Sequence, residues 1–116
     1  MRQLSQGQVI KVEIADPRGQ NKKRRPVVLV TATDELATAE EYVAVAISSK
    51  LTAPLPPDWI LLPWSADGRA KSGLTEPCAA KCHWIVTVRE AEIFSVLGAL
   101  PETVMRDIMR IVEKEK

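Results

Sequence analysis

Polar and hydrophobic positions follow strand-like patterns over most of this chain. Residues 9–14 alternate between apolar and polar side chains and predict a half-buried strand, whereas residues 27–31 form an apolar run that predicts a central strand. Residues 42–47 predict a third strand and residues 58–64 a short fourth one. Residues 78–88 are long enough for one or two further strands.

The end of the chain changes to a helical period, which predicts a helix over residues 101–116. Pro101 suits the first turn of that helix, and Lys114 and Lys116 suit its C-terminal end. The apolar positions fall on one face of the predicted helix: Val104, Met105, Ile108, Ile111 and Val112.

Polar connections separate these elements. Residues 33–41 are expected to be a polar connection, three prolines break the chain within residues 54–57, and residues 65–73 predict a flexible loop. Short strands, long loops and a terminal helix predict a mostly β protein with some α structure (α+β). We expect residues 1–116 to form a single domain, a compact barrel closed by the helix.

Composition and charge narrow the class of protein. With 46% hydrophobic and 27% charged residues, the chain has an ordinary globular composition rather than that of a disordered protein. Its net charge is only +1, but residues 1–33 carry seven cations against two acids (+5), and residues 34–41 carry four acids (−4). This asymmetry predicts one positive working surface.

The sequence also gives expectations about the compartment. No apolar run reaches the roughly 20 residues of a membrane span, and the N-terminus lacks the apolar core of a secretory signal. Two cysteines without such a signal indicate a reducing setting. We therefore expect a cytoplasmic protein that does not enter membranes.

Residues 18–25 form a basic loop that runs into the apolar strand. Phosphate is the anion that best matches several cations in a row, although a solvated surface loop would have the same composition. Arg25 precedes Pro26, which is expected at the first position of the strand, so the fold can hold the Arg25 guanidinium still. The candidate phosphate-binding residues of the loop are Arg18, Gln20, Lys22, Lys23, Arg24 and Arg25.

Hydroxyl groups follow the third strand at Ser48 and Ser49, with Lys50 next. A strand end can hold such hydroxyls rigidly near the mouth of a sheet, but a Ser-Ser pair is also a common strand terminator. Further along, Arg69 and Lys71 could track a phosphate backbone together with Lys50.

Aromatic and sulfur-containing residues leave alternatives open. Trp64 is the best candidate for stacking on a nucleic-acid base, while Trp59 and Trp84 fit a core equally well. Cys78, Cys82 and His83 are three possible metal ligands, but a structural zinc site usually has four. In an extended chain Cys82 and His83 also point to opposite faces, so we expect two buried thiols, no metal and no cofactor.

Taken together, these segments resemble the MazF/PemK/Kid toxins of toxin–antitoxin pairs. The likeness covers nearly the whole chain and rests on the order and spacing of short motifs. These are Gly7-x-Val9-Ile10-x-Val12, Gly19, Arg25-Pro26-Val27-Val28-Leu29-Val30, Val45-Ala46-Ile47-Ser48-Ser49-Lys50, Gly73-Leu74-Thr75-Glu76-Pro77-Cys78, Thr87-Val88 and Leu97-Gly98-Ala99-Leu100.

The resemblance implies an SH3-like β-barrel of the CcdB/MazF type and a homodimer held in check by a MazE-like antitoxin. It further implies a ribosome-independent endoribonuclease that cuts single-stranded RNA without a metal ion. In that reaction the ribose 2′-OH attacks the adjacent phosphorus and leaves a 2′,3′-cyclic phosphate and a 5′-OH.

The resemblance also assigns roles to residues of this chain. The catalytic arginine of the family falls on Arg25, and its strand-end threonine falls on Ser48, which keeps the hydroxyl. Lys81 and His83 replace an arginine and an aspartate that are implicated in proton transfer in Kid-like toxins. His83 is the only histidine and could act as acid or base, or it could simply cap a strand beside Trp84. Gln20 stands where the Kid branch has a histidine, and an amide cannot shuttle protons.

Two rival functions remain open from the sequence. A CcdB-like gyrase poison would share the barrel and the terminal helix, but this chain lacks the Trp-Gly-Ile end of that family. A catalytically silent relative that binds RNA or antitoxin would keep the barrel without turnover. Intact Arg25 and Ser48 favour the nuclease.

Overall fold

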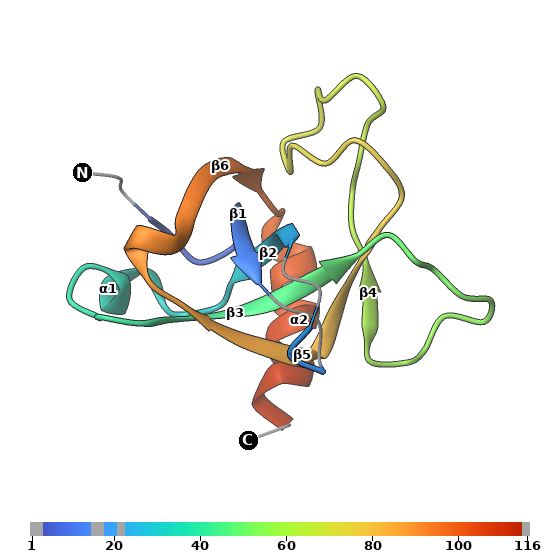
Figure 1. Cartoon of the computed structure of the whole chain (residues 1–116). Coiled ribbons are helices and arrows are strands. Elements are labelled where there is room, and N and C mark those ends of the chain that lie inside the picture. Colours follow the sequence, from blue (N-terminus) through green and yellow to red (C-terminus); the bar gives the residue numbers. More distant parts are fainter. Residues whose placement is uncertain (1–3, 15–17, 21–22, 115–116) are drawn as a thin grey trace.

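Six antiparallel strands form one curled sheet in the order β4-β5-β3-β2-β1-β6 (Figure 1). The computed structural model describes residues 4–14, 18–20 and 23–114. The strands are β1 (Gln8–Ile14), β2 (Lys23–Leu29), β3 (Tyr42–Ser48), β4 (Trp59–Leu61), β5 (Ala79–Val88) and β6 (Ile93–Ala99). The helices are α1 (Thr33–Leu36), the short 3-10 helix η1 (Glu90–Glu92) and α2 (Glu102–Lys114). The mostly β, barrel-like fold with a C-terminal helix is thus confirmed, although β4 and β6 do not pair to close the sheet.

The central strands are buried on both faces, which explains their continuous apolar sequence. Val9, Val28 and Val45 are aligned across β1, β2 and β3 and belong to the core that α2 covers. Helix α2 contributes its predicted apolar face to this core through Met105, Ile108 and Val112. The opposite face of the same strands packs against residues of α1, β5 and β6: Leu36, Val88 and Ile93.

The second strand begins earlier than the sequence predicts. β2 starts at Lys23, so the last cations of the predicted basic loop are strand residues, and Pro26 lies inside the strand rather than at its first position. Pairing of β2 with β3 begins only at Val27, while β1 pairs with β2 from Lys23 onward. A strand with one unpaired side tolerates a proline, because no neighbour there requires its missing N–H.

β6 and α1 are not predicted by the sequence pattern. β6 lacks clean alternation and contains Gly98, which weakens the strand pattern, and its pairing with β1 is interrupted by two register shifts. α1 lies within the predicted polar connection and has only four residues, too few to display a helical period. Among the described residues, no helix combines the length and apolarity needed to cross a membrane.

A segment between β4 and β5 spans the gap between the two edge strands of the sheet. The Ala99 N–H of β6 donates to the Lys71 carbonyl at 2.8 Å. Ser72 is fully buried, and its Oγ donates to the Pro63 carbonyl at 2.7 Å and accepts the Leu74 N–H at 3.2 Å. This side-chain bridge holds the segment in one shape against β6.

We expect Ile108→Ala to lower the free energy of unfolding by about 2–5 kcal/mol, because it empties a fully buried site between α2 and the sheet. Denaturant unfolding at fixed protein concentration measures the change. Glu113→Gln, on the exposed side of α2, is the control and should leave the midpoint unchanged. Equal midpoints for both variants would show that α2 does not hold the core together.

Candidate active site

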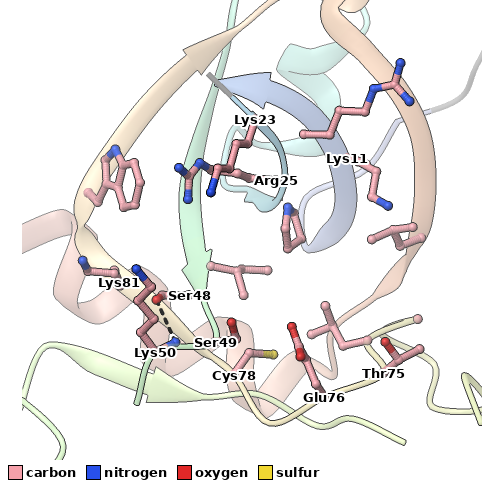
Figure 2. A pocket seen from close by; sticks show the side chains of 17 residues that line it. Lys11, Lys23, Arg25, Ser48, Ser49, Lys50, Thr75, Glu76, Cys78 and Lys81 are labelled. Atoms are coloured by element: carbon pink, nitrogen blue, oxygen red, sulfur yellow. Dashed lines mark hydrogen bonds between the residues drawn. The ribbon is translucent and has the colours of Figure 1, made fainter. Parts of the chain in front are cut away.

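A pocket of about 750 Å³ lies where the ends of β2, β3 and β5 meet the segment that spans the sheet edges. Its described lining carries one acid, Glu76, and six cations: Lys11, Lys23, Arg24, Arg25, Lys50 and Lys81. Figure 2 shows Arg25 and Lys23 on one side of this pocket, Ser48, Lys50 and Lys81 on another, and Glu76 and Thr75 on a third. An excess of five positive charges in this lining favours polyanions over neutral or cationic ligands on electrostatic grounds.

Arg25 reaches the pocket from β2 in a partly fixed position. Arg25 as a whole is half-buried and its Nε atom is buried. The guanidinium carbon lies 5.7 Å from the centre of the Trp84 ring. A guanidinium supported by an aromatic face keeps its charge and its planar fork of donors. Arg25 can therefore present several N–H groups to one phosphate.

Ser48 is the last residue of β3 and lines the same pocket as Arg25. Its Oγ accepts the Lys50 backbone N–H at 3.1 Å, which fixes the turn that follows the strand. Because the oxygen is the acceptor in this bond, the hydroxyl proton is still available to donate to a ligand.

A bulge in β5 brings Lys81 and Trp84 to the pocket. Between the pairs Val45↔Ile85 and Ile47↔Ala80, two steps along β3 correspond to five along β5. Strict alternation would send Lys81 and Trp84 to opposite faces of the sheet, yet both line the pocket.

The Lys81 ammonium lies near two indole rings. Its Nζ is 4.9 Å from the centre of the Trp59 ring and 5.1 Å from that of Trp84. Cation–π contacts of this kind hold the ammonium at one point of the pocket wall. Trp59 and Trp84, which fitted either a core or a binding role, thus support charged groups of the site.

His83 is not among the residues that line this pocket. Its Nδ1 pairs with an Asp58 carboxylate oxygen at the β4 side of β5. Cys82 is buried while His83 is exposed, as expected for neighbours on opposite faces of an extended chain. The bulge gives Lys81 and His83 different surroundings, although they stand only two positions apart.

The other candidate residues from the sequence analysis either line the pocket, lie away from it, or fall outside the described residues. Ser49 and Lys50 line the pocket, as do Lys23 and Arg24, and the Arg24 guanidinium stacks 3.9 Å from the centre of the Phe94 ring. Lys22 falls outside the described residues. The remaining candidates do not line the pocket: Arg18, Gln20, Trp64, Arg69 and Lys71.

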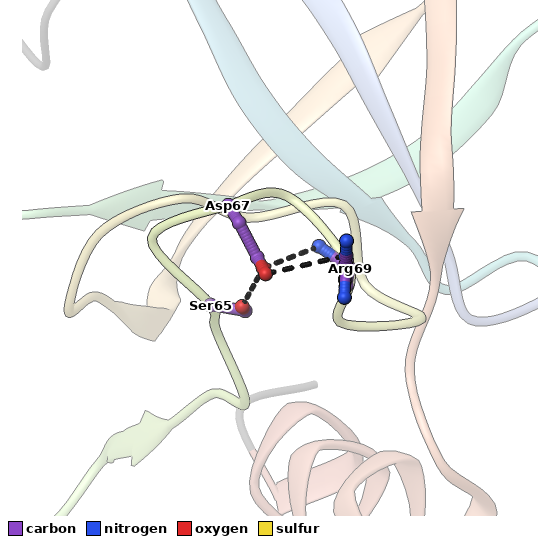
Figure 3. Close-up of polar contacts among 3 residues, drawn as sticks. All are labelled: Ser65, Asp67 and Arg69. Carbon is purple, nitrogen blue, oxygen red and sulfur yellow. Dashed lines mark hydrogen bonds and ion pairs between the residues drawn. The ribbon is translucent and has the colours of Figure 1, made fainter.

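Arg69 has a local partner instead (Figure 3). Its backbone N–H donates to an Asp67 carboxylate oxygen at 3.1 Å, and its Nε lies 3.3 Å from the other oxygen. The Ser65 hydroxyl donates to the same carboxylate, and this bond, followed by the Arg69 N–H, lowers the pKa of Asp67. The triad shapes the loop, while Trp64 beside it is 45% exposed and stays a stacking candidate.

The cysteines behave as buried thiols. Burial, and secondarily the charge of Glu76, raises the pKa of Cys78 to about 11, and burial with Asp58 raises that of Cys82 to about 11. Both groups are therefore protonated at neutral pH. Within the described ranges, no three His, Cys, Asp or Glu side chains gather as metal ligands.

A family model for the PemK-like, MazF-like toxin of type II toxin–antitoxin systems matches residues 5–114 of the chain. The protein belongs to this toxin family. A comparison with curated protein sequences gives no match.

Solved structures share the fold of this PemK/MazF-family toxin at low sequence identity. MazF (Form-I) from Deinococcus radiodurans superposes with a TM-score of 0.76 at 14% identity, covering 99% of this chain and 97% of that one. An endoribonuclease in complex with its cognate antitoxin from a mycobacterial species gives a TM-score of 0.71 at 17% identity, covering 96% and 92%. MazE-MazF (Form-III) from D. radiodurans gives 0.73 at 12%, covering 98% and 96%.

Three polar residues of the toxin's pocket were not predicted from the sequence. Lys11 is a polar position of the alternating first strand, and nothing in that pattern separates it from an ordinary solvent-facing lysine. Thr75 and Glu76 stood inside the motif that carried the resemblance and could have been noted there. Their loop has no periodic pattern, so only the fold shows which residues they face.

The wall that carries Thr75 and Glu76 depends on two glycines. A Cβ at Gly73, where φ is +74°, would meet the Leu97 carbonyl carbon at 2.6 Å, and a Cβ at Gly98 would meet the Ser72 carbonyl carbon at 2.5 Å. Real Cβ atoms do not approach backbone so closely, so the contact between this segment and β6 requires both glycines.

We expect Gly98→Ala to push the segment away from β6 and to lower the free energy of unfolding by about 1–3 kcal/mol. Hydrogen exchange should accelerate at the Ala99 and Leu74 amides, whose bonds to Lys71 and Ser72 hold the segment. Ser95→Ala, in the same strand, is the control. Unchanged exchange at both amides in Gly98→Ala would contradict this account of the wall.

Proposed function

We propose that this PemK/MazF-family toxin is an endoribonuclease that cuts single-stranded RNA at short sequences and that a cognate antitoxin neutralises it. The observation that carries the proposal is the meeting of Arg25, Ser48 and Lys81 in one cation-rich pocket. The toxin family supports the proposal, and the solved relatives include proteins called endoribonucleases. A catalytically silent RNA-binding relative is the alternative that the experiment below separates.

The proposed reaction is attack of the ribose 2′-OH on the neighbouring phosphorus. Negative charge builds on the non-bridging phosphate oxygens as the 2′-oxygen approaches phosphorus. Arg25 stabilises that charge by donating paired N–H hydrogen bonds to these oxygens. Ser48 donates a hydrogen bond to the same phosphate and fixes its rotation. The products are a 2′,3′-cyclic phosphate and a 5′-OH.

Electrostatic stabilisation in this scheme comes from side chains, so we propose that the reaction needs no metal ion. Lys81, held against Trp59 and Trp84, places a second positive charge, after that of Arg25, at the reacting phosphate. Lys11, Lys23 and Lys50 then track flanking phosphates, a role that favours RNA affinity rather than turnover. No step is assigned to His83, which pairs with Asp58 outside the lining.

The partners follow from the same surface. An acidic, extended antitoxin segment would occupy the pocket through the cations that hold RNA, so the two ligands should compete. A homodimer, as the resemblance implies, and a cytoplasmic location belong to the same proposal.

We expect Arg25→Ala to reduce RNA cleavage by about 10²–10³-fold, as the loss of one preorganised charge-stabilising donor does. The assay uses a long single-stranded RNA with chelator present, and end mapping identifies 5′-OH and cyclic phosphate termini. His83→Asn is the matched control from the outer side of β5 and should cleave like the wild type. Intact RNA with the wild-type protein over a broad substrate panel would refute the nuclease.

We expect Ser48→Ala to slow cleavage by roughly 10–100-fold, the rate equivalent of losing a hydrogen bond to a charged group. Ser48→Thr keeps the hydroxyl and should restore most of the activity. Single-turnover rates with excess enzyme measure both variants. A Thr variant as slow as the Ala variant would show that the hydroxyl is not what the reaction uses.

A further inference from the structure

We propose that Glu76 is the general base that takes the proton from the attacking 2′-OH. The inference rests on the proposed ribonuclease function and adds to it the group that activates the nucleophile. It assigns a catalytic role to a residue outside the set of Arg25, Ser48, Lys81 and His83.

The chemistry of the pocket leaves few groups that can accept a proton. Arginine and lysine side chains carry donors and no acceptor in their charged forms, which accounts for most of the titratable lining. Cys78 is buried and keeps its proton at neutral pH. His83 is held by Asp58 outside the lining. Among the described lining residues, Glu76 is the one carboxylate.

The fold also fixes where Glu76 stands. It follows the segment that is anchored to β6 by buried Ser72 and by the close approach of Gly73 to Leu97. The side chain itself is exposed, so a ligand can reach it. An exposed carboxylate next to an anchored segment meets the first requirement of a base, which is access to the proton that it removes.

The placement of Glu76 relative to Lys81 suits an in-line displacement. Figure 2 shows Glu76 and Lys81 on different walls of the pocket, with Arg25 on a third wall across from both. In an in-line reaction the nucleophile and the leaving group lie on opposite sides of phosphorus, so base and acid must face each other across the phosphate. Cations from several elements line the same pocket as Glu76: Lys11 of β1, Lys23, Arg24 and Arg25 of β2, and Lys50 after β3.

In the proposed cleavage step Glu76 takes one proton and Lys81 gives one. The 2′-O–H proton passes to a Glu76 carboxylate oxygen while the 2′-oxygen forms a bond to phosphorus. The bond from phosphorus to the 5′-oxygen breaks, and that oxygen takes a proton from the Lys81 ammonium. Solvent then removes the proton from Glu76 and returns one to Lys81, so no metal, oxidant or co-reactant is consumed.

The test compares Glu76→Gln with the wild type in single-turnover cleavage of a short single-stranded RNA that the wild type cuts once. We expect the rate to fall about 10²–10⁴-fold, the usual contribution of a general base. The dissociation constant for the same RNA with a 2′-deoxy cut site should stay equal or decrease, because the variant removes the one negative charge from a positive pocket. A wall residue with only a structural role would not separate rate from affinity in this way.

A second substrate distinguishes base from acid. When sulfur replaces the 5′-bridging oxygen, the leaving group no longer needs a proton. Lys81→Met should then recover much of its activity, whereas Glu76→Gln should stay slow. Glu76→Asp, which keeps a carboxylate, should be faster than Glu76→Gln, and Glu113→Gln on α2 should match the wild type in every assay.

Three results would contradict the proposal, and each affects a different part of it. If the wild type and Arg25→Ala differ as proposed but Glu76→Gln cleaves like the wild type, the ribonuclease stands and Glu76 is not its base. Rescue of Glu76→Gln by the sulfur substrate would make Glu76 the acid instead of the base. A wild-type protein that cuts no RNA would remove the proposed function itself and this inference with it.

Discussion

Backbone-to-backbone contact between residues 71–73 and β6 is the constraint on which the candidate site depends. The sheet ends in two unpaired edges, β4 and β6, and the chain between β4 and β5 crosses from one to the other. Two glycines permit the approach, and Ser72 satisfies the buried polar groups of the crossing segment. Without this contact Thr75 and Glu76 would have no fixed place, and the pocket would lose the wall that carries them.

A second constraint is local to β5. The bulge opposite Val45 and Ile47 changes the direction of the side chains that follow, so that Lys81 and Trp84 share one cavity while His83 leaves it. Bulges commonly aim side chains next to functional sites, and here the bulge also places Trp59 and Trp84 around the Lys81 ammonium. The Lys81 ammonium and the Arg25 guanidinium thus both lie near an indole ring in the same cavity.

The sequence reveals part of this arrangement for identifiable reasons. The periodic signals of the central strands and of α2 come from burial, so these elements were predictable, as was the basic stretch that ends at Arg25. The strand end at Ser48 was predictable for the same reason.

Other features depend on pairing between distant segments. The start of β2 at Lys23 depends on β1, and β6 depends on a partner that compensates for Gly98. The separation of Lys81 from His83 follows from a bulge that no short-range pattern encodes, whereas the resemblance to Kid-like toxins implied a shared role for them. Glu76 lies in a loop, where only the tertiary contact with β6 shows what its carboxylate faces.

The imbalance of charge in the pocket has a consequence for the folded state. The six cations among the described lining residues repel one another, and the native fold holds them in one cavity at a cost in stability. A polyanion that binds the folded toxin cancels this repulsion and adds its own binding free energy to folding. An acidic antitoxin segment seated in the pocket would thus act as a scaffold as well as an inhibitor. Release of that segment would then leave a folded toxin with a lower free energy of unfolding than the complex.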